Sequence, residues 1–194
     1  MRFVGALALL SISGLAVGCT LISTPEATGM HWSGTSSSSA AGGEFNTGAV
    51  VEDLNGWAFS TSSTFTHATK TAYASKAAQN AWVQEWVSAD VYAAYSSIRP
   101  DASGSGVVLP VGTTIVRAVY DAQGNPTELT VMVKGPSGYN PDLGDWWFGL
   151  ADANGVPETT DGGVMMGRLT QCYSCHQPRS ADDFLFGVPM DDRP

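Results

Sequence analysis

The residues best suited to chemistry lie near the end of the chain. Cys172 and Cys175 are separated by two residues, and His176 follows directly. This spacing is that of c-type haem attachment, because two thiols on one helical turn can add to both vinyl groups of the porphyrin while the next imidazole reaches the iron. The sequence therefore predicts a haem c that is covalently bound through Cys172 and Cys175 and ligated by His176.

Three other interpretations of this motif compete with haem attachment. A thioredoxin-type C-x-x-C lies early in a βαβ unit at a helix N-terminus, whereas this one follows a β-rich region at the far end of the chain. A zinc site needs four ligands, and the chain adds only His31 and His67 to these three residues. A short structural disulfide would leave the adjacent histidine without a role, so haem attachment is the favoured interpretation.

The first residues have the order of an export signal. Arg2 precedes an apolar run over residues 3–10 and then small residues, and the run is too short to span a bilayer comfortably. Residues 15–19, LAVGC, resemble the lipobox of bacterial lipoproteins, in which a peptidase cuts before a lipid-modified cysteine. We expect residues 1–18 to be a signal peptide and Cys19 to carry the lipid, which predicts an exported, membrane-anchored protein of the periplasm or cell envelope. The alternative is a plain signal peptide with a chance cysteine.

Composition divides the remaining chain into a linker and one domain. Residues 19–48 are rich in Ser, Thr, Ala and Gly and are too polar to pack, so they indicate a flexible linker. Residues 49–194 contain enough apolar side chains for a single core, which makes them the predicted haem domain. The net charge of −9 and the lack of any Lys/Arg cluster argue against nucleic acid and anionic lipid as partners. Contact with the membrane is expected through the lipid anchor only.

Hydrophobic periodicity indicates an α+β fold. Residues 66–97 have apolar side chains at helical spacing, which predicts one or two helices. Residues 113–120 and 129–134 are β-branched runs joined by the turn-rich segment 121–126, as in a hairpin. Residues 145–150 predict an aromatic strand and residues 164–166 a short further one. The expected architecture is an antiparallel β-sheet domain with N-terminal helices packed on it and a C-terminal haem-attachment helix.

Several segments of the second half of the chain resemble the cytochrome P-460 and cytochrome c′-beta family. They are LPVGTTIV at 109–116, VMVK at 131–134, GYNP at 138–141, GDWW at 144–147, the haem motif at 172–176 and DDFLF at 182–186. The resemblance covers residues 107–187, and the haem motif is its only individually specific part. It implies a c-type haem held against a mostly β domain, commonly in a homodimer, with His176 proximal and the opposite face of the iron open.

The resemblance implies two different functions. Some members oxidise hydroxylamine with a haem that is cross-linked to a lysine, whereas the c′-beta type lacks the cross-link and binds nitric oxide or carbon monoxide. The cross-linking lysine is expected on the strand over residues 113–120, where Arg117 is the only basic residue, and a guanidinium is a poor nucleophile. Lys134 is the remaining candidate, with a plain strand-end charge as the alternative. We therefore expect gas binding or electron transfer to a redox partner protein, and hydroxylamine oxidation is the alternative.

Other residues are candidates for the surroundings of the haem. Three aromatic residues of the predicted strand are expected either to line the haem pocket or to pack in the core. Four carboxylates are candidates for proton transfer, with a role in turns as the alternative. Four methionines could supply a sulfur as sixth ligand, which would make the iron six-coordinate. These candidates are Trp146, Trp147 and Phe148; Glu128, Asp145, Asp152 and Glu158; and Met132, Met165, Met166 and Met190.

Overall fold

A seven-stranded antiparallel sheet organises the computed structural model, which describes residues 45–78 and 81–194. The strands follow the order β1-β3-β4-β5-β6-β9, and β2 also pairs with β3. Two further strands, β7 and β8, form a separate ribbon. The strands are β1 (Phe65–His67), β2 (Tyr73–Ser75), β3 (Ala81–Ser88), β4 (Thr114–Tyr120), β5 (Pro126–Lys134), β6 (Trp146–Asp152), β7 (Thr159–Thr160), β8 (Gly163–Val164) and β9 (Met166–Gly167).

The helices of the described residues are short. The α-helices are α1 (Thr47–Leu54), α2 (Tyr92–Tyr95) and α3 (Tyr173–His176). 3-10 turns adjoin them at η1 (Asn55–Ser60), η3 (Ala89–Val91), η5 (Thr170–Cys172) and η6 (Gln177–Asp182), and separate 3-10 turns are η2 (Lys76–Ala78), η4 (Pro141–Leu143) and η7 (Met190–Asp192). None of the helices in the described part of the chain has the length and apolar character that crossing a bilayer requires.

The central hairpin follows the sequence prediction. β4 and β5 pair in register, with Ile115 opposite Met132. The carboxylate of Asp121 closes the turn between them by accepting hydrogen bonds from the backbone N–H groups of Gln123 (2.9 Å) and Asn125 (2.8 Å). β5 begins at Pro126, earlier than the predicted residue 129. The predicted aromatic strand is β6, and the segment predicted at 164–166 is divided between β8 and β9.

The prediction of helices over residues 66–97 is wrong. Most of this region forms β1, β2 and β3, and only α2 and short 3-10 turns are helical. β3 pairs with β1 and β2 on one side and with β4 on the other. Its residues Val83, Glu85 and Val87 alternate toward one buried face. Pairing on both sides satisfies the backbone of β3, and this tertiary context overrides the helical spacing of its apolar residues.

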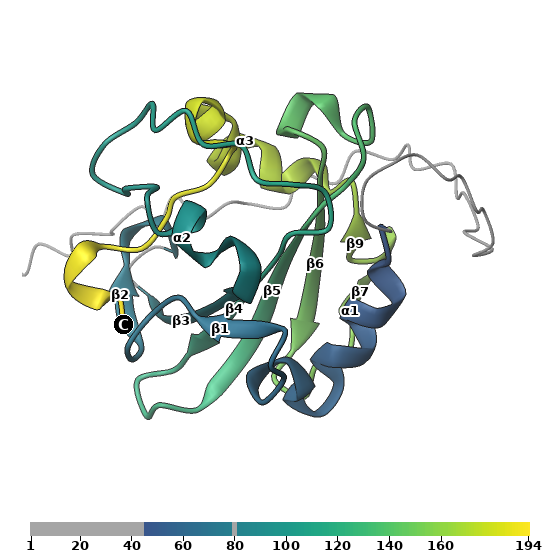
Figure 1. Ribbon diagram of the computed structural model, residues 1–194. Helices are drawn as coiled ribbons and strands as arrows, with labels where there is room; N and C mark the ends of the chain where they lie inside the picture. The colour runs from purple at the N-terminus through teal and green to yellow at the C-terminus, as the bar shows by residue number, and fades with distance from the viewer. Residues whose placement is uncertain (1–44, 79–80) are drawn as a thin grey trace, which may run out of the picture.

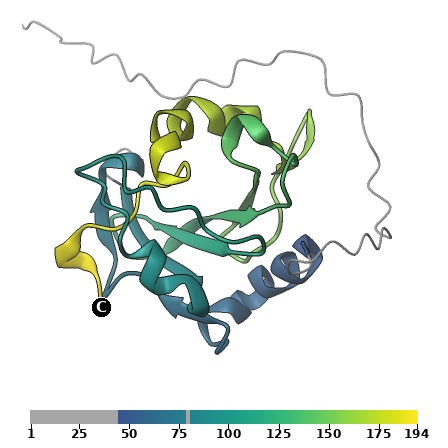
Figure 2. The same ribbon diagram turned by 45° about the horizontal axis from the view of Figure 1, so that its top comes forward.

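Two hydrophobic cores cover opposite faces of the sheet. α1 packs Val50 and Leu54 into one of them, against Val116 and Leu129, and Asn46 caps this helix by accepting a hydrogen bond from Ala49 N–H (3.2 Å). α2 and the C-terminal segment, which we define as residues 183–194, cover the other core. Figures 1 and 2 show α1 and the segment around α3 on opposite sides of the strands. The predicted α+β class, with an antiparallel sheet and a C-terminal helix, is therefore confirmed, but the N-terminal helix on the sheet is α1 and not a helix within residues 66–97. The predicted domain start at residue 49 falls inside α1.

Gly155 packs closely against the backbone at the end of α1, and we expect its replacement by alanine to be strongly destabilising. Its φ is +82°, and an added Cβ would lie 1.9 Å from the carbonyl oxygen of Leu54. Gly124 has the same φ of +82° with nothing within 4 Å of that position. We expect Gly124→Ala to lower the free energy of unfolding by about 1 kcal/mol and Gly155→Ala by about 3 kcal/mol or more, because a backbone clash is added. Urea unfolding measures both, and equal losses would contradict the clash.

Candidate functional site

The predicted attachment residues lie on one helical turn. Cys172 ends η5, and Cys175 and His176 belong to α3. Cys172 is partly buried and packs against the core, whereas Cys175 is exposed. Burial, together with the neighbouring Cys175, raises the pKa of the Cys172 thiol to about 12. The two thiols therefore differ in environment: one faces the interior of the domain and the other its surface.

His176 is held in the protonation state that a metal ligand needs. Its Nδ1 lies 2.7 Å from the carbonyl oxygen of Phe184, and since a carbonyl can only accept, the proton is on Nδ1 and Nε2 carries the lone pair. Burial lowers the pKa of His176 to about 4, and the nearby cation of Arg117 contributes in the same direction. The imidazole is thus neutral at physiological pH, as iron ligation requires.

Aromatic rings hold the imidazole on two sides. Phe148 of β6 and Phe186 of the C-terminal segment make edge-on contacts with the ring of His176, with centroids 5.3 Å and 5.4 Å away. Trp146 lies on the same face of the sheet as Phe148, but Trp147 points to the opposite face and packs in the core that α1 covers. Of the three predicted aromatic residues, Phe148 therefore contacts His176, and Trp147 serves core packing.

The sheet is only partly covered beside His176. On the face that carries Phe148, several side chains of the central strands remain partly exposed, and we call six of them the open floor: Arg117, Val119, Glu128, Thr130, Met132 and Leu150. Their neighbours on the opposite face, such as Leu129 and Val131, are fully buried. Neighbouring strands are about 4.8 Å apart, so the three strands β4, β5 and β6 make a floor about 10 Å wide. A flat ligand held by His176 would find a surface there.

A buried polar cluster lies at the edge of the open floor. Glu85 of β3 has no exposed surface, and it accepts hydrogen bonds from Tyr73 Oη (3.3 Å), Tyr95 Oη (2.6 Å) and Arg117 Nε (3.0 Å). The sequence analysis missed this cluster, although a glutamate among the apolar residues of an alternating strand was a usable signal. Arg117, which occupies the expected position of the cross-linking lysine, is thus one partner of a buried ion pair.

Lys134 is also paired, although it lies at a strand end. It lies at the end of β5, 7% exposed, and its ammonium donates to Asp183 Oδ1. The same ammonium lies over the ring of Trp146, 5.0 Å from the centroid. Asp183 was not singled out in the sequence, because its partner is 49 residues away along the chain.

The remaining carboxylates divide between turns and the open floor. Asp145 accepts a hydrogen bond from the backbone of Asn140 (2.9 Å), and Asp152 accepts one from the backbone of Asn154 (2.8 Å), so both stabilise turns. Glu128 lies on the open floor, where burial and the nearby carboxylate of Glu158 raise its pKa.

The methionines and histidines are spread over the domain. Met132 lies on the open floor, Met165 is within 3.8 Å of Gln171 Nε2, Met166 packs in the core beneath α1, and Met190 is 65% exposed. His67 is exposed and its ring makes a tilted contact with that of Trp86, with centroids 5.0 Å apart, while His31 and Cys19 lie outside the described residues. No group of three or more His, Cys, Asp and Glu side chains suited to a metal ion occurs within residues 45–78 and 81–194.

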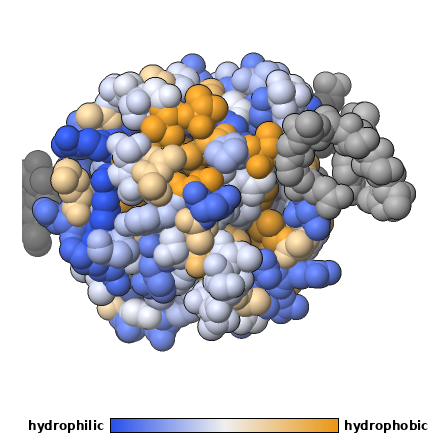
Figure 3. All heavy atoms as spheres, viewed as in Figure 1, coloured by the Kyte–Doolittle hydropathy of each residue, from blue (hydrophilic) through white to orange (hydrophobic). Residues whose placement is uncertain are grey.

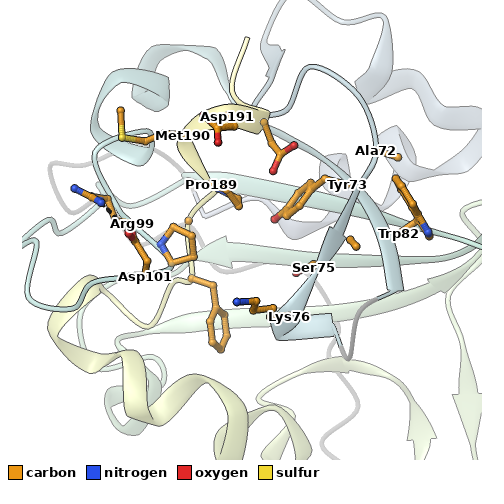
Figure 4. Close-up of a pocket in the computed structure, with 15 residues that line it drawn as sticks. Ala72, Tyr73, Ser75, Lys76, Trp82, Arg99, Asp101, Pro189, Met190 and Asp191 are labelled. Atoms are coloured by element: carbon orange, nitrogen blue, oxygen red, sulfur yellow. Dashed lines mark hydrogen bonds and ion pairs between the residues drawn. The ribbon is translucent and has the colours of Figure 1, made fainter.

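A cavity of about 1020 Å³ opens next to this region. Residues from β2, from the loop at Arg99 and from the C-terminal segment converge on it (Figure 4). Phe186, which contacts His176, is part of its wall. Apolar side chains reach the surface over the part of the molecule where the C-terminal segment lies (Figure 3). Cys172, Cys175, His176 and the open floor are not among the residues that line the cavity, so this cavity lies on the far side of Phe186 from the proposed attachment motif.

Comparison with known proteins identifies one matching family. A protein-family model described as Cytochrome P460 matches residues 52–187. The match begins within α1 and ends one residue after Phe186, which contacts His176. It therefore includes β3 and Glu85 as well as the region of the sequence resemblance. No curated protein and no solved structure matches the chain.

Proposed function

Because the chain belongs to the cytochrome P460 family, which implies a haem cofactor, we propose that it carries one covalent haem c and binds small gases such as nitric oxide. Cys172 and Cys175 would hold the porphyrin, and His176 would ligate the iron through Nε2. The observation that carries the proposal is the neutral imidazole of His176, with Nδ1 committed to the Phe184 carbonyl, beside a partly exposed floor of the sheet.

The residues around His176 fit such a group. Phe148 and Phe186 keep the imidazole in place and exclude water from its sides. The apolar members of the open floor, Val119, Met132 and Leu150, offer a surface against which a porphyrin or a small neutral ligand can pack. When bound, haem supplies an iron centre that coordinates small ligands and exchanges electrons.

Two contacts favour gas binding over hydroxylamine oxidation by a cross-linked haem. A cross-link needs an uncharged amine as nucleophile. Arg117 donates to Glu85 instead, and Lys134 is an ammonium held by Asp183.

Ligand binding by the reduced protein tests this proposal. We expect the ferrous protein, produced with a cytochrome c maturation system, to be high-spin and five-coordinate and to bind carbon monoxide and nitric oxide without displacing a side chain. Hydroxylamine with an electron acceptor should give little or no turnover. A low-spin, six-coordinate ferrous spectrum that Met132→Leu converts to high spin would instead identify an electron carrier. Rapid hydroxylamine turnover with a shifted porphyrin band would identify the cross-linked enzyme.

We also propose that the protein is exported and anchored through Cys19. Cys19→Ala should abolish labelling by a radioactive or clickable fatty acid, because the lipid has no other attachment point in the lipobox. A chain that starts at residue 45 behind an ordinary signal should remain soluble and take up haem. It keeps Asn46, which caps α1, and Phe45, whose ring lies 5.0 Å from that of Tyr139. Continued lipid labelling of Cys19→Ala, or aggregation of the shortened chain, would contradict the anchor.

A further inference from the structure

The orientation of His176 depends on a short turn that is unusual in its backbone. The acceptor of the imidazole proton is the carbonyl of Phe184. Asp183 and Phe184 have φ values of +55° and +64°, a conformation that non-glycine residues rarely adopt. Two such residues in a row are stable only when contacts with other parts of the protein hold them. The contacts that hold this turn therefore set the position of the Phe184 carbonyl.

Asp183 is the residue through which the turn is fastened. Its Oδ1 accepts from the ammonium of Lys134, its Oδ2 accepts from Leu109 N–H (2.9 Å), and its backbone carbonyl accepts from Trp146 Nε1 (2.8 Å). Asp183 is 5% exposed and Lys134 7%. Interactions between charges are stronger in such an interior than in water.

The sheet provides the rigid base for this fastening. Lys134 and Trp146 are register partners at the adjoining ends of β5 and β6, and both reach Asp183. Gly144 leaves room for the ring of Phe184, because a Cβ there would lie 2.6 Å from Phe184 Cδ2. Phe184 N–H also donates to the carbonyl of Arg179 (2.8 Å). The turn is thus held by the ends of β5 and β6 on one side and by Arg179 of η6 on the other.

We propose that Lys134 is a positioning residue for the iron ligand: its ion pair with Asp183 holds the Phe184 carbonyl against Nδ1 of His176 and thereby sets the donor strength of the imidazole. A stronger hydrogen bond at Nδ1 makes the imidazole a better electron donor at Nε2. This inference rests on the proposed haem ligation by His176.

Lys134→Met tests the role of the ammonium in the haem-loaded protein. Methionine keeps the length of the side chain and removes its charge. We expect the iron–histidine stretching frequency in the resonance Raman spectrum of the ferrous protein to shift downward and the midpoint potential to rise, because a weaker donor stabilises ferric iron less. Lys134→Arg, which keeps the positive charge, should stay closer to the natural protein. Lys70→Met makes the same chemical change at an exposed lysine that does not line the cavity of Figure 4 and should leave both quantities unchanged.

A double variant separates positioning from folding. Lys134→Met leaves Asp183 buried without its cation, so the single variant is at risk of unfolding. Lys134→Met with Asp183→Leu removes both charges and should recover stability, but we still expect the downward frequency shift and the raised potential, because the contacts of the Asp183 carboxylate with Lys134 and Leu109 are lost and only backbone and ring contacts still hold the turn. Natural values of both quantities in a folded double variant would overturn the proposal. Absence of covalent haem from the unchanged protein would instead refute the proposed function, so the two failures are distinguishable.

Discussion

Replacing both Cys172 and Cys175 by serine is expected to remove all covalently bound haem. A hydroxyl does not form the thioether bonds that hold the porphyrin. Haem in the double variant should therefore be extracted completely by acidic acetone, and its denatured band should fail to stain for haem peroxidase activity. Ser174→Ala is a matched control, because Ser174 is exposed between the two cysteines on α3 and should keep the full stain. Pigment that survives extraction in the double variant would refute attachment through these residues.

The proposed attachment cysteines and the proposed iron ligand can be replaced separately, so a second variant extends this experiment. His176→Ala keeps both thiols, so covalent haem should remain after extraction. The ferrous absorption spectrum should change, because the imidazole of His176 and its hydrogen bond to Phe184 are both lost. An unchanged spectrum would mean that another residue ligates the iron on the proximal side.

Arg117→Met is expected to cost about 3–5 kcal/mol of unfolding free energy, the usual effect of leaving one partner of a buried ion pair without the other. Glu85 has no exposed surface, and Arg117 supplies its only positive partner among the contacts found in the described residues. The hydroxyls of Tyr73 and Tyr95 would still donate to it, but they carry no charge. Urea unfolding of the haem-loaded protein measures the loss.

Two companion variants identify the cause of that loss. Arg99→Met breaks an exposed pair with Asp101, in which the side chains are 51% and 66% exposed, and it should have little effect because solvent screens such pairs. Glu85→Gln combined with Arg117→Met removes the stranded charge and should recover much of the stability. If Arg117→Met were no more harmful than Arg99→Met, the buried pair would not contribute to the fold as described.

Several features of this protein follow from local sequence alone. The attachment motif is a matter of spacing along one helical turn, so Cys172, Cys175 and His176 could be named without a fold. The β4–β5 hairpin was equally accessible, because β-branched runs flank a turn whose Asp121 bonds to residues two and four positions later. The α+β class and the family resemblance rested on such short-range patterns, and the family match agrees with them.

Only the tertiary structure decided which residues surround the site, because their partners are distant in the chain. The apolar residues of β3 have helical spacing in the sequence, but these residues form a strand because they pair with β4. Lys134 and Asp183 are 49 residues apart, and Glu85 and Arg117 are 32 apart, so neither charge could be assigned a partner from its neighbours. The sequence by itself indicated the haem attachment that we propose at Cys172 and Cys175. The packing of the sheet decided how His176 is held, since buried charges and strained turns are stabilised by contacts that no local pattern records.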